Sequence, residues 1–223
     1  MGNRAVIKPV DMNVGVYVHW NGGRDSVEGF LKYCEMKGYR GLGSDSSYGM
    51  ARLCQVISNY FGGTCSVGVQ QCWGTKDDAQ GLCNGIYEVK GWEIVKRIGY
   101  NGFEQQNHTL QDMLESIDEA QPPKEQFGVG FLRADVVSTA SLKRGDNVYI
   151  TNYDGKTTLQ KVVGFGSDRF VNGRQVKGVP YVDLYGNGED GYADNPNNYL
   201  RDETIRCAVK DTTPAKEDVE CTT

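Results

Sequence analysis

Apolar and polar residues alternate along two short stretches near the N-terminus, "RAVIKPV" (residues 4–10) and "VGVYVHW" (residues 14–20). In the second stretch, Val14, Val16 and Val18 are separated by glycine and tyrosine, and histidine follows the last valine. A period of two residues matches a β-strand, whose successive side chains point to opposite faces of a sheet. We therefore expect two strands here.

The apolar spacing changes to three and four residues in the stretches that follow, residues 24–39 and 48–61. This period matches a helix with one apolar face. The apolar positions of the two stretches are Val27, Phe30, Leu31 and Cys34, and then Met50, Leu53, Cys54, Ile57 and Phe61. We expect two main helices, the first capped by Asp25 or Ser26 and ended by Gly38.

The rest of the first half contains further short elements. Residues 64–73 read as a third strand, residues 85–100 as a hairpin, and residues 109–120 as a short amphipathic helix. Residues 74–84, "GTKDDAQGLCN", are polar and rich in glycine, so we expect an exposed loop there.

The pattern changes after Gln121-Pro122-Pro123, because short strands separated by Asn, Asp and Gly clusters replace the helices. The expected strands are "DNVYITN", "TTLQKVVGFG", "VPYVDLYG" and "TIRCAVK". "LKRGDNVYI" (residues 142–150) resembles the start of a Src-homology-type barrel, in which a Lys/Arg-Gly-Asp turn leads into a strand. The fold class predicted is α+β: an N-terminal mixed sheet with two main helices, followed by a small antiparallel β-barrel-like domain.

These patterns predict a domain over residues 1–121, a second over residues 124–210, and a disordered tail over residues 211–223. The chain of 223 residues is long enough for two small cores. Its tail, "DTTPAKEDVECTT", has too few apolar residues to build a core.

The formal net charge of −5 argues against a general nucleic-acid binder, which needs a basic surface. It favours a protein partner, particularly one with a basic surface. No apolar run is long enough to cross a membrane, and no secretory pattern opens the chain, so we expect a cytoplasmic protein that does not bind membranes.

Seven cysteines are present, and in a reducing cytoplasm we expect them to be mostly free thiols. Cys65, Cys72 and Cys83 lack the C-x-x-C spacing of a zinc site, and their role stays open. H-E-x-x-H and G-x-S-x-G motifs are absent, so the sequence predicts no metal, no cofactor and, on balance, no enzyme.

The stretch "HWNGGR" carries the candidate binding residues His19, Trp20, Asn21, Gly22, Gly23 and Arg24. A strand, a glycine turn and a helix start can hold an anion, because free N–H groups and the helix dipole meet there. A turn with positive φ at Asn21-Gly22 would also explain the glycines, and His19 would then be a buried, hydrogen-bonded side chain. Both interpretations remain open.

"MGNRAVI" with "YVHWNGG" and "SVEGFLKYCEMKGYR" resembles a group of uncharacterised proteins carried by bacterial phages, plasmids and integrated elements. The likeness covers about the first 100 residues and assigns no residue a role. It implies a small accessory protein of a mobile element, and such proteins often bind and block host defence machinery.

The function expected is therefore a non-enzymatic binding protein that inhibits a host defence system by contact with a host protein or complex. The alternatives are a small-molecule or anion-binding protein, or an enzyme, that uses the turn from His19 to Arg24, and a nucleic-acid adaptor that uses the C-terminal barrel. The sequence leaves the partner and the oligomeric state open.

Overall fold

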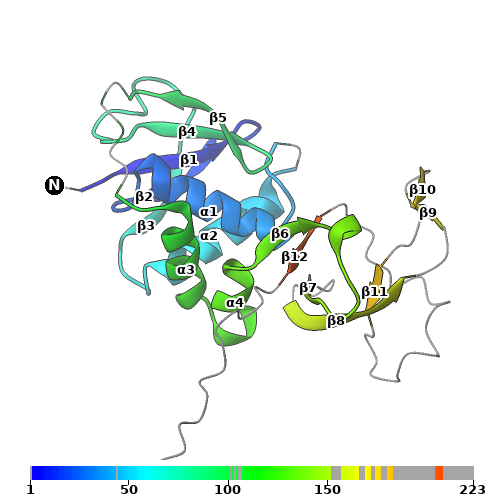
Figure 1. Ribbon diagram of the computed structural model, residues 1–223. Coiled ribbons are helices and arrows are strands. Elements are labelled where there is room, and N and C mark those ends of the chain that lie inside the picture. The colour runs from blue at the N-terminus through cyan, green and yellow to red at the C-terminus, as the bar shows by residue number, and fades with distance from the viewer. Residues whose placement is uncertain are drawn as a thin grey trace, which may run out of the picture. The chain divides into compact units, whose positions relative to one another are not determined.

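A computed structural model describes residues 2–43, 45–100, 102, 104, 107–151, 157–165, 169–171, 174–176, 180–182 and 204–207. The chain forms two compact units, which divide after Leu132 and are described separately below (Figure 1). The predicted disordered tail, residues 211–223, lies outside the described residues.

The first unit contains the strands and helices that the sequence pattern predicts as far as Glu119, and in addition a short helix, Val129–Leu132, after the prolines, where only strands were expected. Its elements are β1 (Ala5–Pro9), β2 (Val14–Val18), α1 (Arg24–Met36), α2 (Ser47–Tyr60), β3 (Val67–Gln71), β4 (Ile86–Lys90), β5 (Glu93–Ile98), α3 (Leu110–Glu119), the 3₁₀ turn η1 (Pro123–Glu125) and α4 (Val129–Leu132). The α+β class is confirmed. Gly38 and Gly62, which follow the C-cap residues of α1 and α2, have φ of +68° and +63°, so both helices end where left-handed backbone favours glycine.

The five strands form one sheet in the order β3-β2-β1-β4-β5. β1 runs parallel to β4, and the other neighbours are antiparallel, so the predicted mixed sheet is confirmed. The central strand β1 is buried along its whole length. Burial of a whole strand requires cover on both faces of the sheet, because successive side chains point to opposite faces.

The helices cover one of these faces. Figure 1 shows α1 and α2 side by side against the sheet, and α3 next to α1. Gly29 lets α1 and α3 approach closely, because a Cβ built on it would lie 2.8 Å from the Cβ of Met113. The capping box of Thr109 and Asp112 fixes the start of α3.

The connection between β3 and β4 covers part of the other face. Cys72 and Ala79 are buried there in a cluster with Val6, Ile86 and Ile98. The expectation of an exposed loop over residues 74–84 is therefore wrong at Ala79. A single buried alanine has no periodicity, so the sequence pattern could not reveal it.

Asp118 fixes the chain after α3. Its Oδ1 accepts hydrogen bonds from the Tyr33 hydroxyl (2.7 Å) and the Phe127 N–H (2.7 Å), and its Oδ2 accepts one from the Gly128 N–H (2.8 Å). The Lys37 ammonium donates to the Glu125 carbonyl and lies 4.0 Å from the centre of the Phe127 ring. The segment after the prolines is thus held on α1 and α3.

This attachment moves the division of the chain. Residues 124–132, which the sequence analysis assigned to the second domain, belong to the first compact unit.

Burial lowers the pKa of Lys37, while the charges of Asp118 and Glu125 act in the opposite direction. A buried cation needs such partners, since an unpaired charge in the protein interior is costly.

The second unit contains β6 (Asp135–Ser138), the 3₁₀ turn η2 (Thr139–Ser141), β7 (Asn147–Thr151), β8 (Thr157–Phe165), β9 (Arg169–Val171), β10 (Arg174–Val176), β11 (Pro180–Val182) and β12 (Thr204–Cys207). Five of these strands form a sheet in the order β11-β8-β7-β12-β6, and β9 pairs with β10. Leu142, Val148 and Val162 form a small buried cluster.

The barrel-like closure predicted for this half is not found, because β11 and β6 end the described sheet without pairing with each other. Strand lengths and turn residues predict strands, but closure depends on whether the first and last strands of the sheet meet. The predicted Lys/Arg-Gly-Asp turn is present: the Asp146 carboxylate accepts from the Lys143 N–H (2.7 Å), and Gly145 has φ of +92°.

We expect Asp118→Asn to lower the free energy of unfolding of the first unit by about 3 kcal/mol, because the carboxylate is lost while Lys37 stays buried. Chemical denaturation measures this change. Glu119→Gln is the matched control, since Glu119 is exposed on the same helix. Equal effects of the two substitutions would show that Asp118 does not hold the segment after α3.

Candidate functional site

Five of the six candidate residues, His19 to Gly23, connect β2 to α1, and Arg24 is the first residue of α1. The positive φ predicted at Asn21-Gly22 occurs at Asn21 (+52°) and at neither of the glycines that follow it. Asn21 tolerates this conformation because its short polar side chain forms local hydrogen bonds. Its amide lies 3.4 Å from the Ser26 hydroxyl and 3.3 Å from the Tyr60 hydroxyl, which ties the turn to α1 and α2.

Gly22 is required by close packing. Its N–H donates to the Asn3 carbonyl (2.8 Å), and its own carbonyl accepts from the Tyr87 hydroxyl (3.1 Å). A Cβ on Gly22 would lie 2.5 Å from the Asn3 oxygen and 2.8 Å from the Cβ of Ala5. The glycine thus lets the turn approach the backbone of the chain before β1, and no ligand is needed to explain it.

Gly23 is the N-cap of α1 and no side chain caps the helix, so the expected cap at Asp25 or Ser26 is wrong, but Asp25 places a carboxylate in the first turn. Asp25 Oδ1 accepts from the Ser26 N–H (2.8 Å), and its Oδ2 accepts from the N–H groups of Asn107 (3.0 Å) and His108 (3.2 Å). Negative charge at a helix N-terminus is favourable. The Asp25 carboxylate therefore lies at the helix start, where the sequence analysis considered a bound anion.

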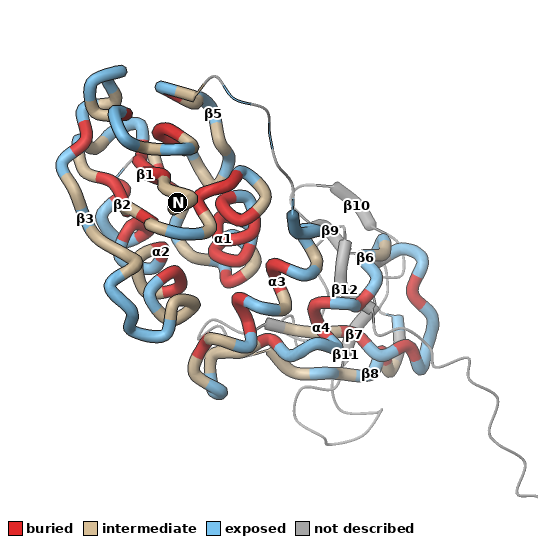
Figure 2. Tube along the Cα trace, turned by 90° about the vertical axis from the view of Figure 1, so that its left-hand side faces the viewer, coloured by how far each residue is buried: buried red, intermediate tan, exposed pale blue. Residues whose placement is uncertain are grey.

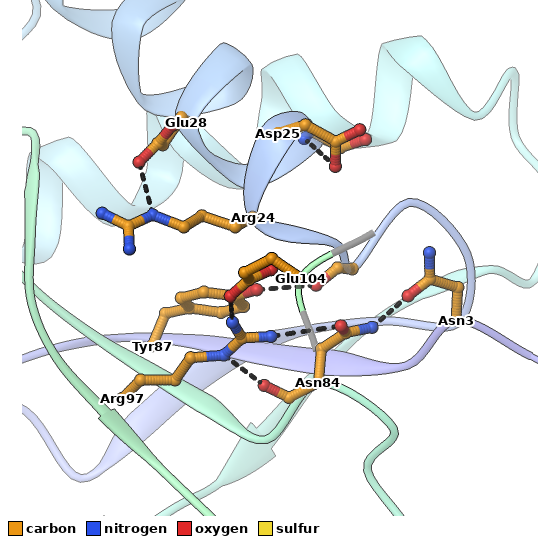
Figure 3. A network of polar contacts seen from close by, with 10 residues as sticks. Asn3, Arg24, Asp25, Glu28, Asn84, Tyr87, Arg97 and Glu104 are labelled. Carbon is orange, nitrogen blue, oxygen red and sulfur yellow. Dashed lines mark hydrogen bonds and ion pairs between the residues drawn. The ribbon is translucent and has the colours of Figure 1, made fainter. Parts of the chain in front are cut away.

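Arg24 extends away from Asp25 and pairs with Glu28 at 2.7 Å (Figure 3). The hydrogen bond to Glu28 raises the pKa of Arg24. The pair spans one helical turn and is exposed, so its contribution to stability is small. Arg24 is thus an exposed helix residue with an internal partner.

Arg97, which the sequence analysis did not consider, lies beneath this turn (Figure 3). Its guanidinium donates to the backbone carbonyl of Asn84 (2.8 Å), to the side-chain oxygen of Asn84 (3.1 Å) and to Glu104. It also lies over the rings of Tyr87 (4.5 Å) and Tyr100 (3.4 Å). Burial lowers the pKa of Arg97. Because these partners all belong to the fold, the polar network around Arg97 stabilises the structure.

His19 and Trp20 lie apart from Arg24. The His19 Nδ1 is 2.9 Å from the Tyr17 hydroxyl, and the two side chains follow each other on one face of β2. The Trp20 ring stands edge-on to His19, with ring centres 5.0 Å apart. His19 is half-buried and hydrogen-bonded. The six residues thus do not converge on one point.

The cysteines form no bridge among the residues described with side chains, since Cys34, Cys54, Cys65, Cys72 and Cys83 carry free thiols. Burial raises the pKa values of Cys34, Cys54 and Cys72, which makes these thiols less reactive. No group of three or more potential metal ligands occurs among the described residues.

The outer strand β3 has backbone N–H and C=O groups without a partner in the described chain, a feature that the sequence reasoning missed. His19 donates to the Ser66 carbonyl, and Cys72 donates to the Asn13 carbonyl. Because backbone groups alternate in direction along an antiparallel pair, the N–H and C=O of Val67, Val69 and Gln71 point away from β2. No described residue pairs with them.

Two exposed tryptophans flank this edge. Trp20 lies near its Val67 end and is 45% exposed, and Trp73 follows its Gln71 end and is 58% exposed. Asp78 fixes the chain at Trp73, because one carboxylate oxygen accepts from the N–H groups of Trp73 (3.0 Å) and Thr75 (2.9 Å). Hydrogen bonds from Thr75 lower the pKa of Asp78.

The two edges of the sheet differ in their protection against pairing. β5 carries Glu93, Lys96 and Arg97, and its pairing with β4 is interrupted by a register shift. Charged residues and bulges protect an edge strand from pairing with another chain. β3, with the sequence VGVQQ, has neither a charge nor a proline, and Val69 is 66% exposed. Figure 2 shows β3 partly exposed next to the buried strands β2 and β1.

Comparisons of the chain with protein-family models, with curated proteins and with solved structures find no match. Among the described residues, no helix combines the length and the apolar character needed to cross a membrane.

Gly22→Ala should lower the free energy of unfolding by about 2 kcal/mol, because the added methyl group meets backbone atoms that cannot move aside. Arg24→Ala should change it by less than about 0.5 kcal/mol. Thermal and chemical denaturation of the two variants provide the comparison. A wild-type melting temperature that rises with phosphate, and an Arg24→Ala variant that loses this rise, would restore the turn as an anion site.

Proposed function

We propose that the protein is a non-enzymatic binding protein that takes an extended segment of a partner protein as an additional strand on β3. The unpaired backbone groups of Val67, Val69 and Gln71 carry this proposal. Strand addition to an open sheet edge is a recurring mode of peptide recognition, in which backbone hydrogen bonds supply affinity and side-chain contacts supply specificity.

The flanking tryptophans supply anchors at both ends of the added strand. Tryptophan is enriched among residues that dominate binding energy, since it buries a large ring and can donate one hydrogen bond. No described residue accepts a hydrogen bond from the indole N–H of Trp20 or Trp73, whereas the third tryptophan, Trp92, donates to the Tyr39 carbonyl (3.0 Å). Trp92 is built into the fold, and the other two are exposed.

The partner that best fits is a host protein or complex with a basic surface around an uncharged extended segment. The net charge of −5 attracts a basic surface over a distance, while the uncharged strand VGVQQ suits a neutral segment at the contact itself. The resemblance to accessory proteins of mobile elements supports a component of a host defence system as the partner, with inhibition as the result.

The alternatives drawn from the sequence gain no support from a specific observation. Arg24 pairs with Glu28, and Asp25 occupies the start of α1, so a ligand at that turn would have to displace internal partners. A nucleic-acid adaptor would need a basic face on the second unit, and nothing in the described residues of that unit supports one.

Val69→Pro should abolish partner binding without unfolding the protein. The Val69 N–H points away from β2, so proline removes a donor from the open edge and leaves the β2–β3 ladder intact. Trp73→Ala should weaken binding by about 2 kcal/mol, or roughly thirtyfold. The measurement is affinity capture from bacterial lysate with quantitative mass spectrometry, followed by titration of the captured protein.

Val69→Ala and Tyr48→Ala serve as controls. The first keeps the backbone donor, and the second removes an exposed aromatic ring on α2, far along the chain from β3. In the complex, the amides of Val67, Val69 and Gln71 should also become protected from hydrogen exchange. A partner that binds Val69→Pro as well as wild type, or a wild-type protein that only forms dimers through this edge, would refute the proposal.

A further inference from the structure

Gly68 lies inside β3, and the fold does not require a glycine there. The five strands of the first unit contain glycine at two positions, Gly15 and Gly68. Gly15 is required by packing, because a Cβ on it would lie 2.5 Å from the Cγ1 of Val6. Glycine weakens the interior of a strand, since it costs conformational entropy and has no side chain to pack. Gly68 therefore calls for an explanation of its own.

Neither the backbone nor a close contact explains Gly68. Its φ does not lie in the left-handed region that favours glycine, and the register of β2 and β3 is continuous along the whole of β3, so no bulge occurs. Apart from the chain neighbours of Gly68, Tyr17 is the only described residue with atoms within 4 Å of a Cβ built there. The nearest of these atoms, at 3.8 Å, is at an ordinary van der Waals distance. A glycine that a strand does not need often marks a place where a ligand or another chain approaches closely.

The missing side chain leaves Tyr17 accessible from the edge of the sheet. Gly68 lies opposite Tyr17 in the register of β2 and β3, so the two residues belong to the same face of the sheet. Tyr17 is half-buried. Because Gly68 has no side chain, β3 places only backbone between Tyr17 and a strand added outside β3.

Tyr17 is held in place by its neighbours. Its hydroxyl lies 2.9 Å from the His19 Nδ1, and the two rings stand edge-on with their centres 6.3 Å apart. The exposed Trp20 ring continues this aromatic row beyond His19. Tyr17 also packs against the buried cluster that contains Val6 and Ile86. A ring that is already fixed loses little freedom when another side chain packs against it, which favours binding.

We infer that the extended segment added to β3 carries an aromatic residue opposite Gly68, and that its ring packs across the glycine against Tyr17. The inference rests on the strand-addition function proposed above. The backbone groups of Val67 and Val69 point outward, so in an antiparallel complex the residue opposite Gly68 occupies a position without backbone hydrogen bonds. Side chains come closest at such positions.

An aromatic side chain fits this position better than a small one. Aromatic pairs on neighbouring strands are favourable, and a large ring across an edge glycine compensates for the side chain that the glycine lacks. An alanine opposite Gly68 would leave the space beside Tyr17 unfilled. The opposite face of β3 differs, because Val67, Val69 and Gln71 fill it with their own side chains.

The test selects peptides that bind the full-length protein from a displayed library of random peptides of about ten residues, the upper length of ordinary strands. Peptides that lose binding to Val69→Pro are those that use the β3 edge. Among them we expect an aromatic residue at one shared position, and its replacement by alanine should weaken binding at least about tenfold. In the wild-type complex, nuclear Overhauser contacts should join the peptide ring to the Tyr17 ring and to the Gly68 α-protons.

Gly68→Val provides the matched variant. Valine suits a strand, fills the space beside Tyr17 and keeps the outward backbone groups of β3. This variant should bind the aromatic peptide at least about tenfold more weakly than wild type does, and should bind the alanine peptide equally well. Ser58→Val, at an exposed position of α2, controls for the added side chain and should change neither affinity.

The outcomes separate this inference from the function on which it rests. Peptides that need the β3 edge but share no aromatic residue, or whose ring contacts Val69 in place of Tyr17, would overturn the inference and leave strand addition standing. A selection in which no peptide depends on the β3 edge would overturn both. The contacts in the wild-type complex give an answer even if a variant does not fold.

Discussion

The burial of β1 on both faces is the constraint on which the rest of the first unit depends. A strand without an exposed face needs helices on one side and another cover on the opposite side, and it needs neighbours at both edges. The helices α1 and α2 provide the first cover, with α3 packed next to α1, and the connection around Ala79 provides the second (Figure 1). With β1 in the centre, β3 and β5 become the outer strands of the described sheet.

Close contacts at single residues then fix how the elements meet. Gly29 sets the approach of α1 to α3, and Gly22 sets the approach of the β2–α1 turn to the start of β1. Asp118 fastens the segment up to Leu132 with two hydrogen bonds, and a third, from Tyr33, ties Asp118 to α1. The polar network at the start of α1 satisfies its own charges in the same way, which is why it is better explained as part of the fold than as a binding site.

The outward backbone groups of β3 and the Nε of Arg4 remain without partners in the described chain. The β3 groups lie at an exposed edge and are suited to another strand. The Arg4 Nε belongs to the residue before β1 and is shielded from solvent, which is uncommon in a folded protein. Neither belongs to a motif that a sequence pattern defines.

The sequence by itself determined the strands of the first unit, its helices α1 to α3 and the glycine stops of α1 and α2, because periodicity and turn residues act within a few neighbours. It also directed attention to His19. The tertiary structure decided the rest: that Asp25 occupies the helix start, that Phe127 packs beyond the prolines, that the described strands of the second sheet do not close into a barrel, and that β3 lies at an edge. These outcomes depend on contacts between residues far apart in the chain, which local patterns do not encode.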